Sequence, residues 1–194
     1  MTSLQPDYHA DDGVIRIRPF RAEDVDGFFE AASESIDTLS QWLPWATPAY
    51  SRSDAEYWVA SRIVCWRENK GEQSFIIEDF TDGRILGCIG LAARMTPVTS
   101  CGNIGYWLRN SATGRGTMAR AVRLVIAYGF TKLPIHRVEI SADVRNFASR
   151  RTAERAGLNF ECICAAGLMW QGQPVDCAAY SLTRQQWQTL VAQT

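Results

Sequence analysis

Residues 102–122 read GNIGYWLRNSATGRGTMARAV, and this stretch decides the fold. Residues 101–109 have the composition of a strand, and apolar residues at helical spacing predict a helix that reaches about Thr131. Between the two, Gly114 and Gly116 flank an arginine. Glycine adopts turn conformations closed to other residues, and the first backbone N–H groups of a helix have no partner inside it. This order of elements predicts a backbone site for an anion.

The charges around this turn are unevenly distributed. Residues 1–82 hold seven Lys and Arg against sixteen Asp and Glu, residues 83–138 hold eight against none, and residues 139–194 hold five against five. A charge run is often only a solvated surface, but the acid-free block contains the glycine turn, which favours a polyanion as ligand. Nucleic acid is a poorer candidate, because the net charge of the whole chain is −1.

Length and composition indicate one globular domain over residues 1–194, with residues 1–12 as a flexible leader. The chain is 46% hydrophobic and has seven tryptophans, enough for a full core. It has no apolar run near the roughly 20 residues that span a bilayer and no signal-peptide pattern, so we expect a cytoplasmic protein that does not bind membranes. Six scattered cysteines without CxxC spacing predict reduced thiols and no metal site.

The rest of the chain predicts alternating strands and helices with recognisable caps. Ser53 and Glu56 have capping-box spacing for a helix from Asp54 to Glu68, Asn146 and Gly157 bound a second helix, and Thr183 and Gln186 cap a third. A further helix is expected at 22–32. Strands are expected at 13–20, 73–80, 85–93, 136–143, 160–166 and 175–182.

The chain resembles the GCN5-related N-acetyltransferases, and within them the RimJ/RimL-type branch. Six pieces in order carry the resemblance, which covers nearly the whole chain: RIRPF (16–20), QWLPW (41–45), GNIGYWLR (102–109), GRG (114–116), NFASRRTAERAGL (146–158) and YSLTRQQW (180–187). The resemblance implies an α+β fold. Its central, mixed, mostly antiparallel twisted sheet would have about seven strands, splayed in the middle and flanked by helices.

The resemblance also implies acetyl-coenzyme A as co-substrate, with its pyrophosphate held by the glycine turn and no metal. Arg115, Arg120 and Arg109 could add positive charge there, although an ordinary strand-to-helix turn is the simpler alternative. Thr113 and Met118 depart from the family pattern. The residues expected to bind the cofactor are Trp107, Leu108, Arg109, Gly114, Arg115, Gly116, Thr117, Met118, Ala119 and Asn146. For Trp107 we expect the backbone to act and the side chain to fill the core.

The catalytic residues implied by the resemblance are Ser149 and Asn146. Many relatives carry a tyrosine proton donor where this chain has Ala153, whereas the RimL-type branch uses a serine in an Asn-x-x-Ser pattern. Ser149 would protonate the leaving sulfur, and Asn146 would hold the amide arm of the cofactor or orient the serine. Plain helix capping by both residues is the alternative.

A general base is harder to assign. The RimL-type glutamate would fall near Leu168, and Asn103 stands where relatives often have glutamate, which leaves Glu139 and Glu161 as candidates that are more simply surface residues. An α-amine, with a pKa of about 8, is neutral about a tenth of the time at pH 7, far more often than lysine. This favours a protein or peptide N-terminus as acceptor, and the resemblance to the RimJ/RimL-type branch implies one of the ribosomal-protein type.

The acidic segment 1–82 would line the acceptor side in this fold, so we expect a cationic acceptor such as a basic peptide N-terminus or a polyamine. Trp42 and Trp45 could wall the acceptor slot, with core packing as the alternative. Two other functions stay open: acetylation of a small-molecule amine (a polyamine, an aminoglycoside or an amino-acid-like compound), and binding of acyl-coenzyme A without turnover, as a sensor. A homodimer is also expected.

Overall fold

The computed structural model describes residues 8–193, and within them one eight-stranded sheet has the order β1-β2-β3-β4-β5-β6-β8-β7. Neighbouring strands are antiparallel except β5 and β6, so the expected mixed, mostly antiparallel sheet is confirmed. The strands are β1 (Ala10–Asp11), β2 (Ile15–Pro19), β3 (Gln73–Asp79), β4 (Ile85–Thr96), β5 (Thr99–Leu108), β6 (Arg137–Asp143), β7 (Asn159–Trp170) and β8 (Gln173–Thr183).

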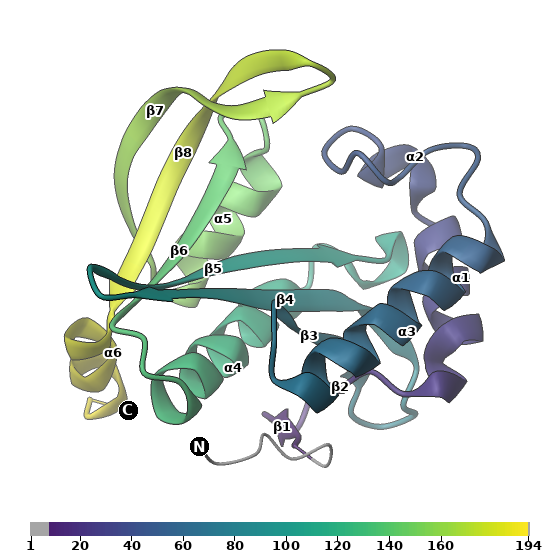
Figure 1. Cartoon of the computed structure of the whole chain (residues 1–194), viewed down its shortest axis with the longest axis horizontal. Helices are drawn as coiled ribbons and strands as arrows, with labels where there is room; N and C mark the ends of the chain where they lie inside the picture. The colour runs from purple at the N-terminus through teal and green to yellow at the C-terminus, as the bar shows by residue number, and fades with distance from the viewer. Residues whose placement is uncertain (1–7, 194) are drawn as a thin grey trace.

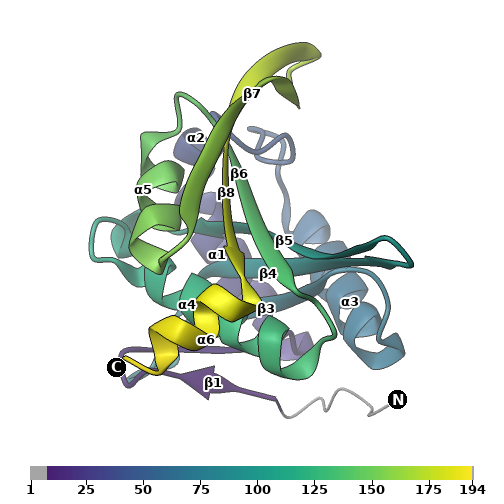
Figure 2. The ribbon, with the colours of Figure 1, turned by 90° about the vertical axis from the view of Figure 1, so that its left-hand side faces the viewer.

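Helices cover both faces of this sheet, as expected for an α+β fold (Figures 1 and 2). They are α1 (Val25–Ser33), α2 (Ile36–Leu39), α3 (Arg52–Glu68), α4 (Thr117–Lys132), α5 (Phe147–Ala156) and α6 (Arg184–Val191). Helix α4 packs on β2, β4 and β5, α5 packs on β6, β7 and β8, and α1 and α3 pack on the other face.

The alternation of apolar residues along the central strands explains the two layers. In β3, Phe75 and Ile77 belong to the core under α4, whereas Ile76 belongs to the core under α1 and α3. Likewise Ile89 faces α4, and Trp107 faces α1. Because neighbouring side chains on a strand point to opposite faces, a run of apolar residues is buried on both sides.

The sheet splays in its middle, as the resemblance implied. Strand β5 pairs with β6 only at Cys101–Asn103, opposite Arg137–Glu139. Beyond these residues the two strands separate, and Figure 1 shows β6, β7 and β8 turning away from β4 and β5. The second half of β5 therefore has backbone groups on this side that no described neighbouring strand pairs.

Three local expectations need correction. The cap of α3 is Ser51 with Asp54, not Ser53 with Glu56, so the helix starts two residues earlier than predicted. The expected leader, residues 1–12, includes strand β1, while its residues 1–7 lie outside the described part. This strand makes the sheet eight-stranded where about seven strands were expected.

The other expected caps are confirmed. The Asn146 side chain accepts a hydrogen bond at the start of α5, and Gly157 ends that helix in the left-handed conformation. Thr183 and Gln186 form a capping box at α6. These signals are local, so they can be identified without knowledge of the tertiary fold.

Candidate functional site

The glycine turn between β5 and α4 has the conformation that an anion site needs. Gly114 and Gly116 have φ values of +78° and +79°, in the left-handed region that favours glycine. A Cβ built on either residue would meet no atom within 4 Å, so the backbone is open to an approaching group. Gly116 is the N-cap of the 16-residue helix α4 and caps it with no side chain. The first N–H groups of α4 therefore have no partner within the helix.

A cleft of about 520 Å³ opens at this turn and follows the splay of the sheet. One wall is the second half of β5 with the start of α4, and another is the second half of β6 with α5. Trp42, in the segment after α2, and Trp170, at the end of β7, line the cleft as well. The opening between β5 and β6 thus connects the turn with the centre of the sheet.

Most residues predicted to bind a cofactor lie together along this cleft. The members that line it are Trp107, Leu108, Gly114, Gly116, Thr117, Met118, Ala119 and Asn146. The Trp107 side chain is buried and packs on Phe28 with ring centroids 5.3 Å apart, as expected for an aromatic core residue. Arg115 is exposed on the turn and Arg109 lies elsewhere, so neither lines the cleft.

Arg109 is buried and anchors the end of β5 to helix α1. Its Nε donates to Glu34 Oε2 (2.8 Å), its Nη2 to Glu30 Oε1 (2.7 Å) and its Nη1 to the carbonyl of Ile85 (3.2 Å). Hydrogen bonds from Arg109 and from the Ser111 backbone lower the pKa of Glu34 to about 2. The expected contribution of this guanidinium to phosphate binding does not fit its position, because all three of its nitrogens are engaged at α1 and β4.

The acid-free block is not a free positive patch, because acids from other segments pair with half of its basic residues. Arg120 binds Asp12 at 2.7 Å, which removes the second cation expected at the turn. Besides Arg109, Arg84 and Arg137 also form ion pairs with glutamates. In the described part of segment 1–82, Asp12, Glu30 and Glu34 are neutralised in the same way.

Two basic residues that the sequence interpretation missed lie on the opposite wall of the cleft. Arg151 and Arg155 of α5 are exposed and line the cleft. They are one helical turn apart, so both fall on the same side of α5. Positive charge at this cleft therefore comes from α5, and the pattern that could have revealed it is the Arg-x-x-x-Arg spacing behind Ser149.

Ser149 and Asn146 lie together at the start of α5 and both line the cleft. Asn146 Oδ1 accepts a hydrogen bond from the Ser149 backbone at 3.0 Å, so the capping role is present. The Ser149 hydroxyl takes no part in this capping hydrogen bond, which uses the backbone N–H. It forms a hydrogen bond with the hydroxyl of Tyr106, with 3.0 Å between the oxygens.

Tyr106 is a third residue that the sequence interpretation missed. It lies on β5 beside Trp107 and was counted as a strand residue, yet its hydroxyl reaches α5 across the splay. Burial raises the pKa of Tyr106 to about 12, while the hydrogen bond to Ser149 acts in the opposite direction. The phenol therefore stays protonated and can donate a proton or a hydrogen bond at the cleft.

The two glutamates considered as bases lie away from the cleft. Glu139 and Glu161 both pair with Arg137, at 2.8 Å and 2.5 Å. Hydrogen bonds from Arg137 and Ser181 lower the pKa of Glu161 to about 2. Neither glutamate lines the cleft. Their position therefore fits a structural ion pair with Arg137 rather than the role of a general base.

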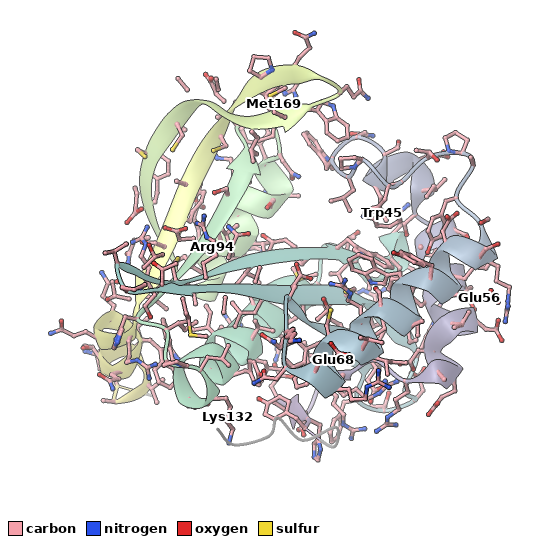
Figure 3. The ribbon with its side chains drawn as sticks, viewed as in Figure 1. Trp45, Glu56, Glu68, Arg94, Lys132 and Met169 are labelled. Carbon is pink, nitrogen blue, oxygen red and sulfur yellow. The ribbon has the colours of Figure 1, made fainter. Side chains whose placement is uncertain are left out.

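The two tryptophans expected at an acceptor slot are separated. Trp42 lines the cleft, whereas Trp45 lines a second cavity of about 590 Å³ on the other face of the sheet. Figure 3 shows Trp45 in the segment that follows α2, and Met169, another residue of the cleft wall, on the β7–β8 hairpin. Leu43, Gly105, Tyr106 and Trp107 line both hollows, which therefore meet at β5.

Metal ligation and membrane insertion find no support among residues 8–193. No group of three or more His, Cys, Asp or Glu in this part of the chain could hold a metal ion. None of its helices is long and apolar enough to cross a bilayer.

The chain matches a known family and a curated relative. The family described as an acetyltransferase (GNAT) domain matches residues 15–159. Over 175 residues the chain is 30% identical to the protein named "Putative ribosomal N-acetyltransferase YdaF" of Bacillus subtilis (strain 168), which covers 90% of this chain and 93% of that relative.

Two solved structures share the fold. The microcin C7 self-immunity acetyltransferase MccE, in complex with acetyl-CoA and AMP, superposes with a TM-score of 0.82 and 20% identity over 94% of this chain and 99% of that one. RimL, a ribosomal L7/L12 alpha-N-protein acetyltransferase in complex with coenzyme A, superposes with a TM-score of 0.78 and 20% identity. The match covers 89% of this chain and 95% of that one.

Proposed function

Because the chain belongs to the GNAT acetyltransferase family, we propose that it transfers the acetyl group of acetyl-coenzyme A to the α-amine of a protein or peptide N-terminus. The observation that carries this proposal is the meeting of two hollows at β5, one of which begins at the glycine turn. Such an arrangement suits a reaction between two substrates that enter from opposite faces. Holding both in line supplies much of the rate acceleration.

The residues of the cleft fit the parts of acetyl-coenzyme A. The backbone N–H groups from Gly114 to Ala119 would hold the pyrophosphate, since the helix dipole and unpaired amides both favour negative charge. Arg151 and Arg155 would add charge from the other wall. The unpaired backbone of β5 would bind the pantetheine arm. When bound, the cofactor supplies a thioester, which carries the acetyl group.

Ser149 would protonate the sulfur as the C–S bond breaks, and its hydroxyl would regain the proton that the amine loses when the C–N bond forms. The 3.0 Å hydrogen bond to Tyr106 orients its hydroxyl and connects it with a second protonated oxygen. Asn146 fixes the first turn of α5 and so the position of Ser149. The alternative, a purely structural serine, predicts that removal of its hydroxyl leaves turnover unchanged.

The acceptor enters from the second cavity in this proposal. Its wall includes the carboxyl-bearing residues Asp54 and Glu72, which supports a cationic acceptor. Asp54 also accepts the capping bonds of Ser51, and Glu72 lies 3.9 Å from Arg62. The KM of the acceptor should then rise with ionic strength, since salt screens such attraction. A KM that does not change with ionic strength would exclude a cationic acceptor.

Mass spectrometry of an acceptor panel tests the proposal. Peptides with free N-termini, polyamines, aminoglycosides and amino acids are mixed with acetyl-coenzyme A, and both the mass gain and free thiol are measured. Acetylation confined to peptide α-amines supports the proposal. Acetylation of small amines favours a small-molecule enzyme, and binding without thiol release favours a sensor.

The expected homodimer and cytoplasmic location stay predictions, which sedimentation and imaging of the tagged chain would test.

A further inference from the structure

The second cavity is built on the face of the sheet that carries α1 and α3. Its floor is the central antiparallel pair of β4 and β5, where Gly90 lies opposite Gly105 and Cys88 lies opposite Trp107. A Cβ on Gly105 would meet nothing within 4 Å, so the floor is open at the point shared with the cleft. A small group can therefore reach the β5 backbone here.

Glu72 covers the other half of this floor. A Cβ built on Gly90 would come within 2.1 Å of Glu72 Oε1, so the carboxylate lies directly over the glycine. The Ser74 hydroxyl donates to Oε1 at 2.6 Å, and Arg62 Nη1 lies 3.9 Å from the same oxygen. An ionised carboxylate can accept about four hydrogen bonds, so Glu72 retains capacity for a further donor. No role in the cleft accounts for this residue.

Aromatic side chains form the walls of the cavity. Trp45 and Tyr50 have ring centroids 5.3 Å apart, and Trp45 also packs on Trp107 at 5.8 Å. Aromatic faces attract ammonium groups, and this attraction adds to that of a carboxylate. The aromatic lining residues are Phe28, Trp45, Tyr50, Tyr57, Trp58, Tyr106 and Trp107.

Two polar atoms of the lining residues have no hydrogen-bond partner in the described part of the chain: the Tyr50 hydroxyl and Trp58 Nε1. Burial and the charge of Asp54 raise the pKa of Tyr50 to about 12, so its hydroxyl is protonated at neutral pH. An indole N–H can only donate. Buried donors of this kind are normally paired. Both atoms are closed to solvent, so a ligand oxygen can pair with them only when the side chains around them move.

We propose that Glu72 binds the amine of the acceptor, and that Tyr50 and Trp58 bind a carbonyl oxygen next to that amine. The inference rests on the proposed function and narrows its substrate class. An α-amine followed by a carbonyl, as at a peptide N-terminus, satisfies both halves of the cavity. A protonated polyamine offers only N–H donors and leaves Trp58 without an acceptor.

Binding of small probes tests this without turnover. The tryptophan fluorescence of the full chain is titrated with three probes. They are alanine amide, isopropylamine, in which a methyl group replaces the carboxamide, and N-acetylalanine amide, in which the amine is blocked. Alanine amide should bind about tenfold more tightly than either of the others. Equal affinity for alanine amide and isopropylamine would overturn the role of Tyr50 and Trp58.

Variants separate the two halves of the site. Glu72→Gln should weaken alanine amide about tenfold, because it removes a charge-assisted hydrogen bond at nearly constant shape. Glu72→Asp, which keeps the charge on a shorter side chain, should give an intermediate affinity and serves if the glutamine variant does not fold. Tyr50→Phe and Trp58→Phe should each lower the affinity for alanine amide to that for isopropylamine. The control is Glu68→Gln, an exposed carboxylate at the end of α3 (Figure 3), which should change nothing.

Kinetics with a peptide acetylated in the panel distinguish this inference from the proposed function. Glu72→Gln should raise the peptide KM about tenfold, leave the KM of acetyl-coenzyme A unchanged and flatten the salt dependence. Peptide acetylation with an unchanged KM in this variant would refute the inference alone. Glu72-dependent binding of alanine amide without acetylation of any peptide would refute the proposed function alone.

Discussion

Replacement of Arg109 by methionine should destabilise the protein by about 3 kcal/mol, at the lower end of the range for breaking a buried ion pair. The Arg109 side chain is 2% exposed, and its loss leaves the Ile85 carbonyl without this donor and Glu34 without its guanidinium partner. Glu30 is 66% exposed and returns to water at little cost. Glu34 keeps its bond from the Ser111 backbone, which limits the loss.

The destabilisation should depend on pH. Arg109 and Ser111 hold the pKa of Glu34 at about 2, well below its ordinary value. The ionised Glu34 therefore stabilises the folded state fully above about pH 4.3, the ordinary pKa of a glutamate. This stabilisation is lost as the pH falls toward about 2, because the unfolded chain binds the proton first. Without Arg109 the pKa of Glu34 returns toward its usual range. The difference between the native protein and the variant should shrink in acid.

Thermal and urea denaturation, both followed by circular dichroism, measure these effects. At pH 7 the variant should lose about 6–12 °C in Tm, since about 1 kcal/mol corresponds to 2–4 °C in a domain of this size. Arg94→Met, an exposed arginine of the same acid-free block (Figure 3), is the control and should stay within about 0.5 kcal/mol. A loss below about 1 kcal/mol, or one equal at pH 7 and about pH 3.5, would refute the reasoning.

Two further predictions concern the catalytic serine and the corrected helix cap. Ser149→Ala should lower kcat about 100-fold with little change in the KM of acetyl-coenzyme A, and Tyr106→Phe should lower kcat less, about tenfold, because the serine retains its hydroxyl. Steady-state kinetics with an acetylated peptide measure both, and an unchanged kcat in Ser149→Ala would exclude the proton-donor role. Ser51→Ala should cost about 1 kcal/mol of unfolding free energy and Ser53→Ala close to none. Equal losses in urea denaturation would contradict the observed cap.

The parts of the fold that could be predicted from sequence are those set by short-range chemistry. Asn146, Gly157 and Thr183 mark helix ends because their side chains or conformations act within three or four residues. The α3 cap shows the limit of such signals. Ser51 with Asp54 and Ser53 with Glu56 are overlapping patterns, and the extended backbone of Ser51 decides between them.

The parts of the site that could not be predicted depend on contacts between distant segments. Arg109 finds Glu34 across 75 positions, and Tyr106 finds Ser149 across 43. Local charge counts treated Arg109 as free, because its partner lies in another segment. The glycine turn was predictable, since positive φ and an uncapped helix start leave a signature within a few residues.

The most direct test of the central claim, that the backbone of the turn holds the diphosphate, is calorimetric titration of coenzyme A into the native protein, Gly116→Ala and Gly83→Ala. Gly83 is a matched control, with a φ of +72° and no atom within 4 Å of an added Cβ, as at Gly116, but away from the cleft. Both variants should lose a similar stability, about 1–2 kcal/mol. Only Gly116→Ala should weaken the binding of coenzyme A, by about tenfold or more. Equal affinities in all three, or no heat with the native protein, would contradict the account.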